Sequence, residues 1–248
     1  MVMIKTKDKK RISRTNIVRP RIEDLGVICG IEHSGWNSKE EGMVANQDAL
    51  KNRIKLGTID LLEHDGIPSG IISYQNPSWI NSETIAQIMG RYGHSGFLPW
   101  NEIVQEYNLP RNWYEATNGG FIKGSGVNTH DPTSDCTFLI GVTIIPEKRG
   151  FHLVDYLVEN ALNVSRDGGK KFAIGYARIP CLSKEYENPT IDEVEAYLRE
   201  KKQGTELPRD LGARFHVRNG GKVVSVIPEV MEDTQSRNYC FLVVYDLR

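Results

Sequence analysis

The chain has 248 residues, which is long enough for one large domain or two small ones and for a core that needs no disulfide. Its 31 basic and 32 acidic residues leave a formal net charge of −1, so overall charge does not point to a nucleic-acid or membrane partner. The sequence lacks the long apolar run of a membrane span, and no apolar stretch of a secretory signal follows its basic start. We therefore expect a cytoplasmic protein with no nucleic-acid or membrane partner.

The beginning of the chain is strongly basic, since residues 1–21 carry eight Lys or Arg against one acid. We expect residues 1–15 to form a flexible basic arm, either solvated or docked on an acidic partner, and residues 16–248 to form one domain. The four cysteines are far apart, with neither CxxC spacing nor an adjacent His. This pattern predicts free thiols and no metal site.

Apolar spacing in the N-terminal third predicts a strand, two helices and a β-hairpin. Leu25, Ile28 and Ile31 recur at helical intervals, and the turn signal around Gly66 joins two apolar runs. The expected elements are a strand at 16–20, helices at 21–31 and 40–56, and strands at 59–62 and 67–74.

Residues 76–133 are the least regular part of the chain and are too long for a hairpin loop. A structureless connection of this length is rare in a compact domain, so we expect short helices at 82–90 and 99–107. Such an insertion between two strands commonly shapes a substrate pocket.

The C-terminal half alternates between strand and helix patterns. A nearly continuous apolar run at 136–145 predicts a central strand, residues 149–166 repeat apolar positions at helical intervals, and 171–179 return to strand. A strand–helix–strand unit of this kind implies a right-handed crossover between parallel strands. Thr190 and Glu193 have the spacing of a capping box for a last helix to about 202, and two more strands are expected at 222–227 and 239–247.

One turn in this half has the order of an anion-binding site. Val142 lies in the last part of a predicted strand that ends at Pro146. Gly150 then allows a tight turn, and a predicted helix begins near Leu153. Backbone N–H groups at a helix N-terminus have no helical partner, and they face an anion together with the positive end of the helix dipole.

Here the sequence resembles the GNAT superfamily of N-acetyltransferases. Its signature is a strand ending in Pro and then an Arg/Gln-x-x-Gly-x-Gly/Ala turn that cradles the coenzyme A pyrophosphate. Pro146, Glu147, Arg149 and Gly150 match a frequent form of that turn, whereas His152 and Val154 stand where the family has its two signature glycines.

The resemblance implies a fold with a mixed, mostly antiparallel sheet, in which the fourth and fifth expected strands, 136–145 and 171–179, form a parallel and splayed pair flanked by helices. The insertion at 76–133 would lie between the third and fourth strands. Acetyl-CoA or another acyl-CoA would be the co-substrate, with no metal. The residues implied to bind it are Val142, Ile144, Lys148, Arg149, Gly150, Phe151, His152, Leu153 and Val154.

The resemblance also implies residues for chemistry and for the acceptor. Amine acylation needs a base for the ammonium group, a donor for the oxyanion and an acid for the departing thiolate. Tyr197 resembles the tyrosine that protonates the thiol, with Tyr186 as the second choice. Glu115, His130 and Asp135 are candidate bases near the open end of the central strand. Trp36, His33 and Arg178 are candidate acceptor-site residues, although each has packing or surface solvation as its alternative.

Three functions remain open from the sequence. The first is acyl transfer to an amine, with a small metabolite as the expected acceptor. The second is decarboxylation of a malonyl thioester and loading of an acyl carrier protein, because Trp36 and Thr143 also resemble residues of GNAT-like loading domains of polyketide synthases. That branch pairs the threonine with a histidine, where this chain has Tyr176 and Arg178. The third is acyl-thioester binding without turnover.

Overall fold

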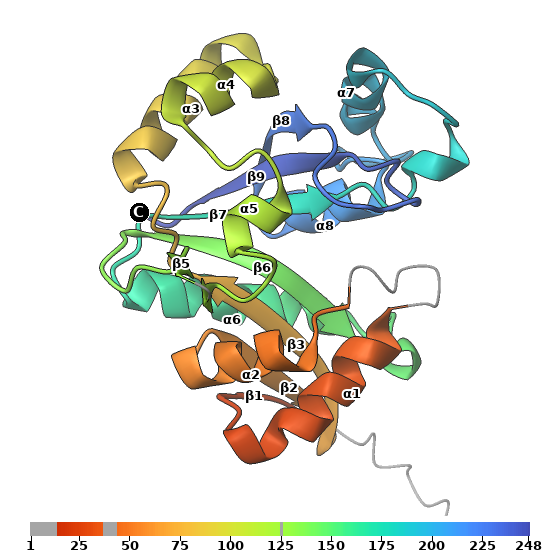
Figure 1. The fold of residues 1–248 in the computed structure, drawn as a ribbon. Helices are drawn as coiled ribbons and strands as arrows, with labels where there is room; N and C mark the ends of the chain where they lie inside the picture. The colour runs from red at the N-terminus through yellow and green to blue at the C-terminus, as the bar shows by residue number, and fades with distance from the viewer. Residues whose placement is uncertain (1–13, 37–43, 125) are drawn as a thin grey trace, which may run out of the picture.

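The computed structural model describes residues 14–36, 44–124 and 126–248. These residues build one seven-stranded sheet in the order β1-β2-β3-β6-β7-β9-β8, with helices on both faces (Figure 1). The strands are β1 (Thr15–Val18), β2 (Ile59–His64), β3 (Ile67–Gln75), β6 (Cys136–Ile144), β7 (Phe172–Arg178), β8 (Lys222–Ile227) and β9 (Cys240–Asp246). The predicted basic arm, residues 1–15, falls almost wholly outside the described ranges.

The expected mixed sheet is confirmed. Only β6 and β7 run parallel within it, and every other pair of neighbouring strands is antiparallel. The parallel pair was expected to be the fourth and fifth strands of the chain, and this numbering was wrong, because the pair is formed by the sixth and seventh strands. Two short strands of the insertion, β4 (Lys123–Gly124) and β5 (Val127–Asn128), precede it and pair with each other outside the main sheet.

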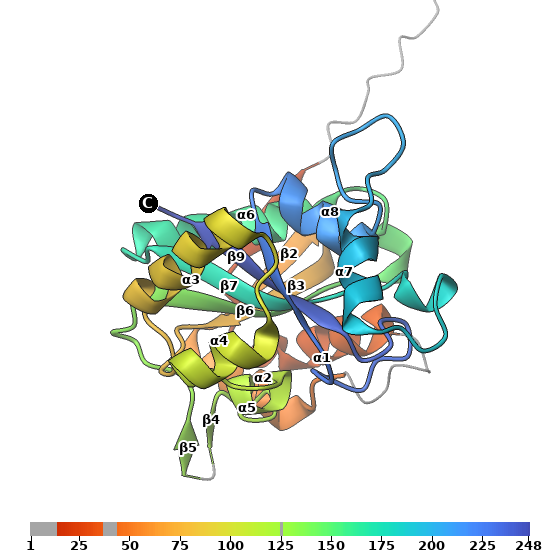
Figure 2. The same cartoon turned by 90° about the horizontal axis from the view of Figure 1, so that it is seen from above.

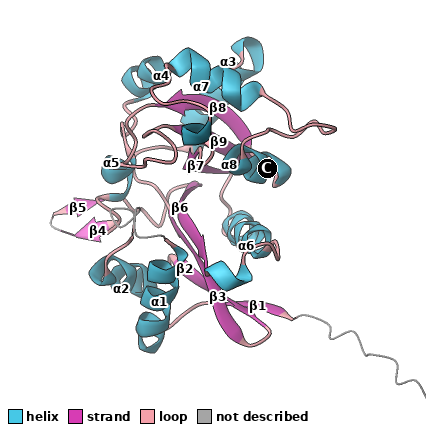
Figure 3. Cartoon of the chain, turned by 90° about the vertical axis from the view of Figure 1, so that its right-hand side faces the viewer, coloured by secondary structure: helices cyan, strands magenta, loops and turns pink. Residues whose placement is uncertain are grey.

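Three helices flank the first half of the sheet. α1 (Leu25–Gly35) and α2 (Gln47–Leu56) cover one face, and α6 (Leu153–Asp167) covers the other (Figure 3). α1 follows a short 3-10 helix at Ile22–Asp24, and α2 starts later than predicted because Asn46 caps it by accepting a hydrogen bond from the Ala49 N–H. The start of the helix predicted at 40–56 lies partly outside the described residues.

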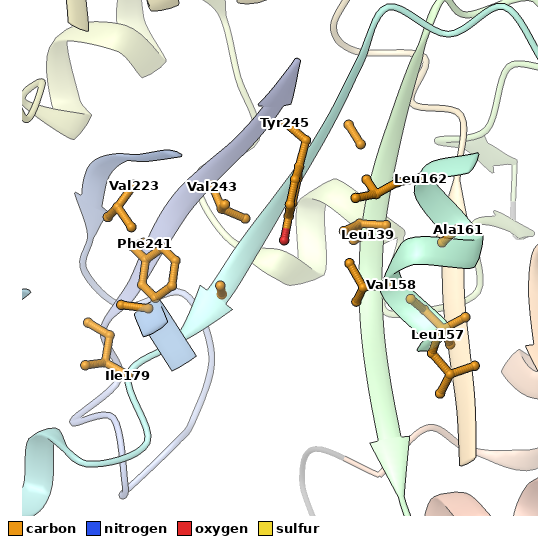
Figure 4. Packing of buried hydrophobic residues seen from close by; sticks show 14 of the residues in the cluster. Leu139, Leu157, Val158, Ala161, Leu162, Ile179, Val223, Phe241, Val243 and Tyr245 are labelled. Carbon is orange, nitrogen blue, oxygen red and sulfur yellow. The ribbon is translucent and has the colours of Figure 1, made fainter. Parts of the chain in front are cut away.

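Apolar clusters fix these helices to the sheet. On the α1–α2 face the cluster includes Ile28, Leu50 and Ile71. On the opposite face Leu139 of β6, Leu157 of α6 and Tyr245 of β9 belong to one apolar cluster (Figure 4). Because a strand buried on both faces must be apolar throughout, the continuous apolar run predicted as a central strand is the centre of the molecule.

The insertion forms helices, as predicted for its two longest segments. α3 (Ser82–Ser95), α4 (Trp100–Tyr107) and α5 (Trp113–Thr117) lie on the same face as α1 and α2, and α3 and α4 lie over the far end of the sheet (Figures 1 and 2). Trp100 and Phe138 pack there around Tyr176, with ring centroids 5.6 Å and 5.2 Å from its own. The insertion thus covers this end of the sheet with apolar side chains that would otherwise leave it exposed to solvent.

Two further helices lie on the α6 face near the C-terminal strands. α7 (Ile191–Arg199) carries the predicted capping box, in which Glu193 accepts hydrogen bonds from the backbone and hydroxyl of Thr190. α8 (Leu211–Arg218) was not predicted, and it packs beside β7 and β8. Among the described residues no helix is both long and apolar enough to traverse a membrane.

Candidate active site

A cavity of about 700 Å³ opens where β6 and β7 separate. Its lining comes from both faces of the sheet. On the α1–α2 face it includes Glu32, Trp36, Arg53, Trp113, Thr143 and Arg178, and on the α6–α8 face it includes Ile72, Leu139, Val142, Val154, Val158 and Phe215. The cavity therefore connects the two faces through the gap between the parallel strands.

The gap has a local cause in β6. Pairing of β6 with β7 ends at Leu139 and Gly175, although both strands continue. On the other edge, β3 pairs Ser73 with Gly141 and Tyr74 with Leu139, so Ile140 is the extra residue of a β-bulge. A bulge bends its strand, so β6 turns away from β7 and leaves its backbone groups beyond Leu139 without a strand on that side.

Trp113 of α5 contacts this freed edge directly. Its indole N–H donates to the Ile140 carbonyl at 3.1 Å, which satisfies one group that a neighbouring strand would otherwise bind. The insertion therefore helps to keep the gap open, because an unpaired buried carbonyl would favour closure of the two strands.

The predicted phosphate turn lies at the end of β6. A short 3-10 helix (Pro146–Lys148) leads into two residues of the left-handed region, Gly150 with φ of 88° and His152 with φ of 58°. Within the described residues, none of the backbone N–H groups from Gly150 to Val154 donates a hydrogen bond. Five free amides at the start of a long helix suit a pyrophosphate.

The nine predicted cofactor residues are brought together at this turn and along β6. Val142 and Val154 line the cavity, and the rest form the turn or flank it. The Arg149 side chain folds back over the strand end, with Nε 3.4 Å from the Ile144 carbonyl and Nη2 hydrogen-bonded to the Gly35 carbonyl. Arg149 therefore ties the turn to the end of α1.

A buried carboxylate lies on the opposite face of the sheet. Glu32 of α1 accepts a hydrogen bond from the Thr143 hydroxyl at 2.8 Å and another from the Ala45 N–H at 3.1 Å. The side chains of Glu32 and Thr143 are buried, and both line the cavity. A Cβ at Gly35 would lie 1.9 Å from the Thr143 methyl group, so only glycine permits this approach of α1 to β6.

Arg178 and Trp36 form the second polar group of this face. The Arg178 guanidinium lies 5.2 Å from the centre of the Trp36 ring and makes a bidentate contact with buried Asp233, at 2.7 Å and 2.8 Å. These hydrogen bonds hold the pKa of Asp233 below its ordinary value against the opposing effect of burial. The indole N–H of Trp36 is buried and has no acceptor among the described residues.

Histidine enters the cavity from the α6–α8 face. The His216 Nδ1 lies 2.6 Å from the Tyr245 hydroxyl, and burial lowers the pKa of His216 to about 3. The imidazole is therefore neutral near pH 7. This part of the cavity carries no charged group from α8.

No family model matches the chain. A curated relative, the uncharacterised N-acetyltransferase YkwB of Bacillus subtilis, is 24% identical over 128 residues, and the alignment covers 51% of this chain and 52% of that protein. The chain thus matches about half the length of this relative.

Solved structures match over nearly the whole chain. The loading GNATL domain of CurA from Lyngbya majuscula has a TM-score of 0.65 and 21% identity, covering 94% of this chain and 98% of that one. The GphF GNAT-like decarboxylase, in complex with isobutyryl-CoA, has a TM-score of 0.63 and 20% identity, covering 95% and 100%. An N-acetyltransferase from Staphylococcus aureus Mu50 has a TM-score of 0.50 and 11% identity, covering 95% and 99%.

The chain has the GNAT fold. The resemblance inferred from the strand, turn and helix around Gly150 is thereby confirmed at the level of fold. The β6–β7 pair is the splayed parallel pair of this GNAT fold, and the predicted phosphate turn joins β6 to α6.

Three of the predicted catalytic and acceptor-site residues line the cavity of the GNAT fold, namely Thr143, Trp36 and Arg178. The others do not. Tyr197 is buried between α7 and the C-terminal strands beside Tyr186, and His33 is exposed on α1 next to Glu32. Glu115 is exposed and accepts from the Arg111 N–H, while His130 accepts from the Asn76 N–H. Burial lowers the pKa of His130, which keeps it neutral in that structural contact.

Glu32 and Arg53 also line the cavity, and neither was predicted from the sequence. Glu32 follows Ile28 by four residues, and Arg53 lies among Ala49, Leu50 and Ile54, so both charges occupy the apolar stripe of a helix. A charged residue within such a stripe is a signal of a buried polar site.

Proposed function

We propose that the protein transfers an acyl group from coenzyme A to an amine by direct attack of the amine on the thioester. One observation carries this proposal: a single cavity joins a turn with free amides to a buried carboxylate through the gap between β6 and β7. The thioester would lie in the gap, between the two sites.

The coenzyme A portion belongs on the α6 side of the sheet. Its pyrophosphate would meet the amides of Gly150–Val154, and its pantetheine arm would pass along the unpaired edge of β6. The lining there is apolar, with Val142, Val154 and Val158, which suits an alkyl amide chain. Backbone groups of β6 can hydrogen-bond that arm as a strand would.

The acceptor amine belongs on the α1–α2 side, next to Glu32. Glu32 would take a proton from the ammonium group, and the free amine would then form a C–N bond with the thioester carbon. The C–S bond breaks as the tetrahedral intermediate collapses, and the second amine proton leaves with the thiolate as thiol. Thr143 orients Glu32 through their 2.8 Å hydrogen bond.

Among the described residues that line this cavity, the tyrosines are Tyr176 and Tyr114, and the Tyr114 side chain is 72% exposed to solvent. Tyr197 stays a prediction that its position does not support, and the Tyr176 hydroxyl already donates to the Pro110 carbonyl at 2.8 Å. We therefore propose that the thiolate takes its proton from the intermediate itself, without a dedicated tyrosine.

Thermal unfolding with coenzyme A, acetyl-CoA and pantetheine, which is the arm of coenzyme A without its phosphates, tests the cofactor assignment. A ligand that binds only the folded state stabilises it by about 2.7 kcal/mol at 100 times its dissociation constant. We expect coenzyme A to raise the melting temperature and pantetheine to raise it much less. An unchanged melting temperature at millimolar coenzyme A would overturn the proposal.

Decarboxylation of a malonyl thioester is the second candidate function, and the lining of the cavity by both Trp36 and Thr143 favours it. In that case an acyl carrier protein, rather than a small amine, would be the partner. Carbon dioxide release from malonyl-CoA or a malonyl carrier protein, without amine and dependent on Thr143, would establish it. Thioester binding with neither product would leave the non-catalytic alternative.

A further inference from the structure

A further charged side chain on the α1–α2 face, besides Glu32 and Arg178, has no role in the chemistry above. Arg53 of α2 is 3% exposed and lines the cavity. Its Nε donates to the Gly120 carbonyl at 2.9 Å, and its Nη1 donates to the Ser73 hydroxyl at 3.3 Å. Its Nη2 is buried and has no acceptor among the described residues.

A buried cation with an unused donor is costly unless something else compensates it. Within the described ranges no carboxylate forms an ion pair with Arg53. Desolvating an unpaired charge costs several kcal/mol even after relaxation, and an unmet hydrogen bond adds to that cost. A substrate anion would remove both penalties when it binds.

Tying α2 to the insertion does not require a cation. The preceding residue, Asn52, makes a similar tie with a neutral amide, donating to the Phe121 carbonyl at 2.5 Å and to the Lys123 carbonyl at 2.8 Å. Asn52 is not part of the cavity wall. The tie between α2 and the insertion that Asn52 makes therefore does not explain why residue 53 carries a charge.

The sheet register places Arg53 close to the proposed amine site. Ser73, its hydrogen-bond partner, lies two residues from Ile71 on β3, and Ile71 pairs directly with Thr143. Residues two apart in a strand share a face and are separated by about 7 Å. A small amino acid spans such a distance with a hydrogen bond at each end.

We propose that Arg53 binds a carboxylate of the acceptor, so that the acceptor is an amino acid or a similar amine that carries a carboxylate. This inference rests on the proposed function, since the amine end of the acceptor is held at Glu32 and Thr143. The wall then matches a zwitterion, with an anion facing the ammonium group and a cation facing the carboxylate.

The protonation state of Arg53 is consistent with this role. Burial lowers the pKa of its guanidinium to about 10, and the charge of Glu32 acts in the opposite direction. Arg53 therefore stays positively charged near pH 7 despite its burial.

Matched pairs of acceptors test the proposal. Acetylation from acetyl-CoA is measured with phenylalanine against phenethylamine and with 4-aminobutyrate against propylamine, together with calorimetric binding of each in the presence of coenzyme A. We expect at least one carboxylated member to be preferred by roughly ten- to a hundredfold in kcat/KM, mostly through KM, since charge-assisted hydrogen bonds contribute on that scale. Arg53→Gln should remove this preference, and Arg53→Lys should restore part of it.

Asn52→Ala is the matched control, because it also loosens the tie between α2 and the insertion. It should keep the preference for the carboxylated acceptor. An equal loss in Asn52→Ala and Arg53→Gln would assign Arg53 to structure and overturn the proposal. So would equal use of both members of each pair by the unaltered protein, or an Arg53→Gln effect confined to malonyl-CoA decarboxylation.

Failure of the inference and failure of the proposed function have different signatures. If carboxylate-free amines are acetylated while their carboxylated partners are not preferred, acyl transfer stands and the role of Arg53 falls. If coenzyme A leaves the melting temperature unchanged and no amine is bound or acetylated, both fall together.

Discussion

The two halves of the cavity differ in what they offer a ligand. On the α6–α8 side the wall is mostly apolar, its histidine is neutral near pH 7, and the polar groups left for a ligand are the backbone amides of the turn at Gly150. On the α1–α2 side the wall carries charged side chains, namely the buried Glu32 and Arg53 and the partly buried Arg178, which is paired with Asp233 behind it. Backbone amides suit a ligand part that never changes, whereas charged side chains specify a particular partner.

The halves meet at the gap and at one further contact. Arg149 belongs to the turn, and its guanidinium is hydrogen-bonded to the Gly35 carbonyl at the end of α1, three residues after Glu32. Thr143 belongs to β6, the strand along which we propose that coenzyme A lies, but its side chain points to Glu32. If the two halves are separable, a change on one side should leave binding on the other intact.

The largest expected effect is that of Glu32→Gln. The amide keeps the size of the side chain, and its one oxygen keeps one of the two contacts, with the Thr143 hydroxyl or with the Ala45 N–H. It cannot take the amine proton, so kcat should fall by about 10²- to 10⁴-fold. The rise in melting temperature with coenzyme A should stay unchanged, because that ligand is bound on the other side. Glu23→Gln, at an exposed position, should alter neither quantity. A loss of coenzyme A binding in Glu32→Gln would show that the halves are not separable.

A smaller effect is expected from His216→Gln on the pH dependence of stability. Burial lowers the pKa of folded His216 to about 3 from 6.5, so the unfolded chain binds the proton more tightly. The contribution of neutral His216 to the free energy of unfolding is fully present above about pH 6.5. It is lost as the pH falls toward 3, by at most about 1.4 kcal/mol per pH unit. Glutamine cannot titrate.

Urea midpoints of the two proteins at pH 7, 6, 5 and 4 measure this difference. The variant should lose less stability than the unaltered protein over that range, even if it is less stable at pH 7. Parallel pH profiles would mean that His216 is more hydrated than its contacts indicate, and the contrast between the two halves would weaken accordingly.

Patterns within single segments predicted most elements of the fold. The hairpin around Gly66, the central strand and the capping box at Thr190 were each specified by local signals, and each was found. α8 was missed because Ala213, Phe215 and Val217 alternate with polar residues as they would in a strand, although Asp210 caps a helix there. A period of two favours a strand unless a neighbouring surface selects the helix.

The candidate site was predictable where its residues act through the backbone, and much less so elsewhere. The turn at Gly150 follows from strand, proline and glycine order alone. The partnership of Glu32 with Thr143, by contrast, joins residues 111 positions apart and depends on the close approach that Gly35 permits. Tyr197 was chosen by resemblance, and its side chain instead serves the core, because α7 turns that face onto the sheet.

The smallest effect is expected from His152→Ala, although His152 stands where the family signature has a glycine. Its φ of 58° and ψ of 22° show that the backbone adopts the conformation for which glycine is normally used. The imidazole is 70% exposed and lies 3.3 Å from the carboxylate of Asp155 in the first turn of α6. The amides of Gly150–Val154 need no particular side chain at this position, so the dissociation constant of coenzyme A should change less than about twofold on a scale where tenfold is 1.4 kcal/mol.

His152→Gly sharpens the same test, because glycine relieves the left-handed strain, which costs other residues about 1–2 kcal/mol. It should therefore raise the melting temperature slightly while leaving coenzyme A binding as it is. Calorimetric titration of the three proteins at pH 6 and pH 8 separates the outcomes. If affinity rose at pH 6 only when His152 is present, the imidazolium would contact the phosphates. If strong binding appeared only in His152→Gly, the side chain would obstruct the turn, and the α6 half of the cavity would not be a working cofactor site.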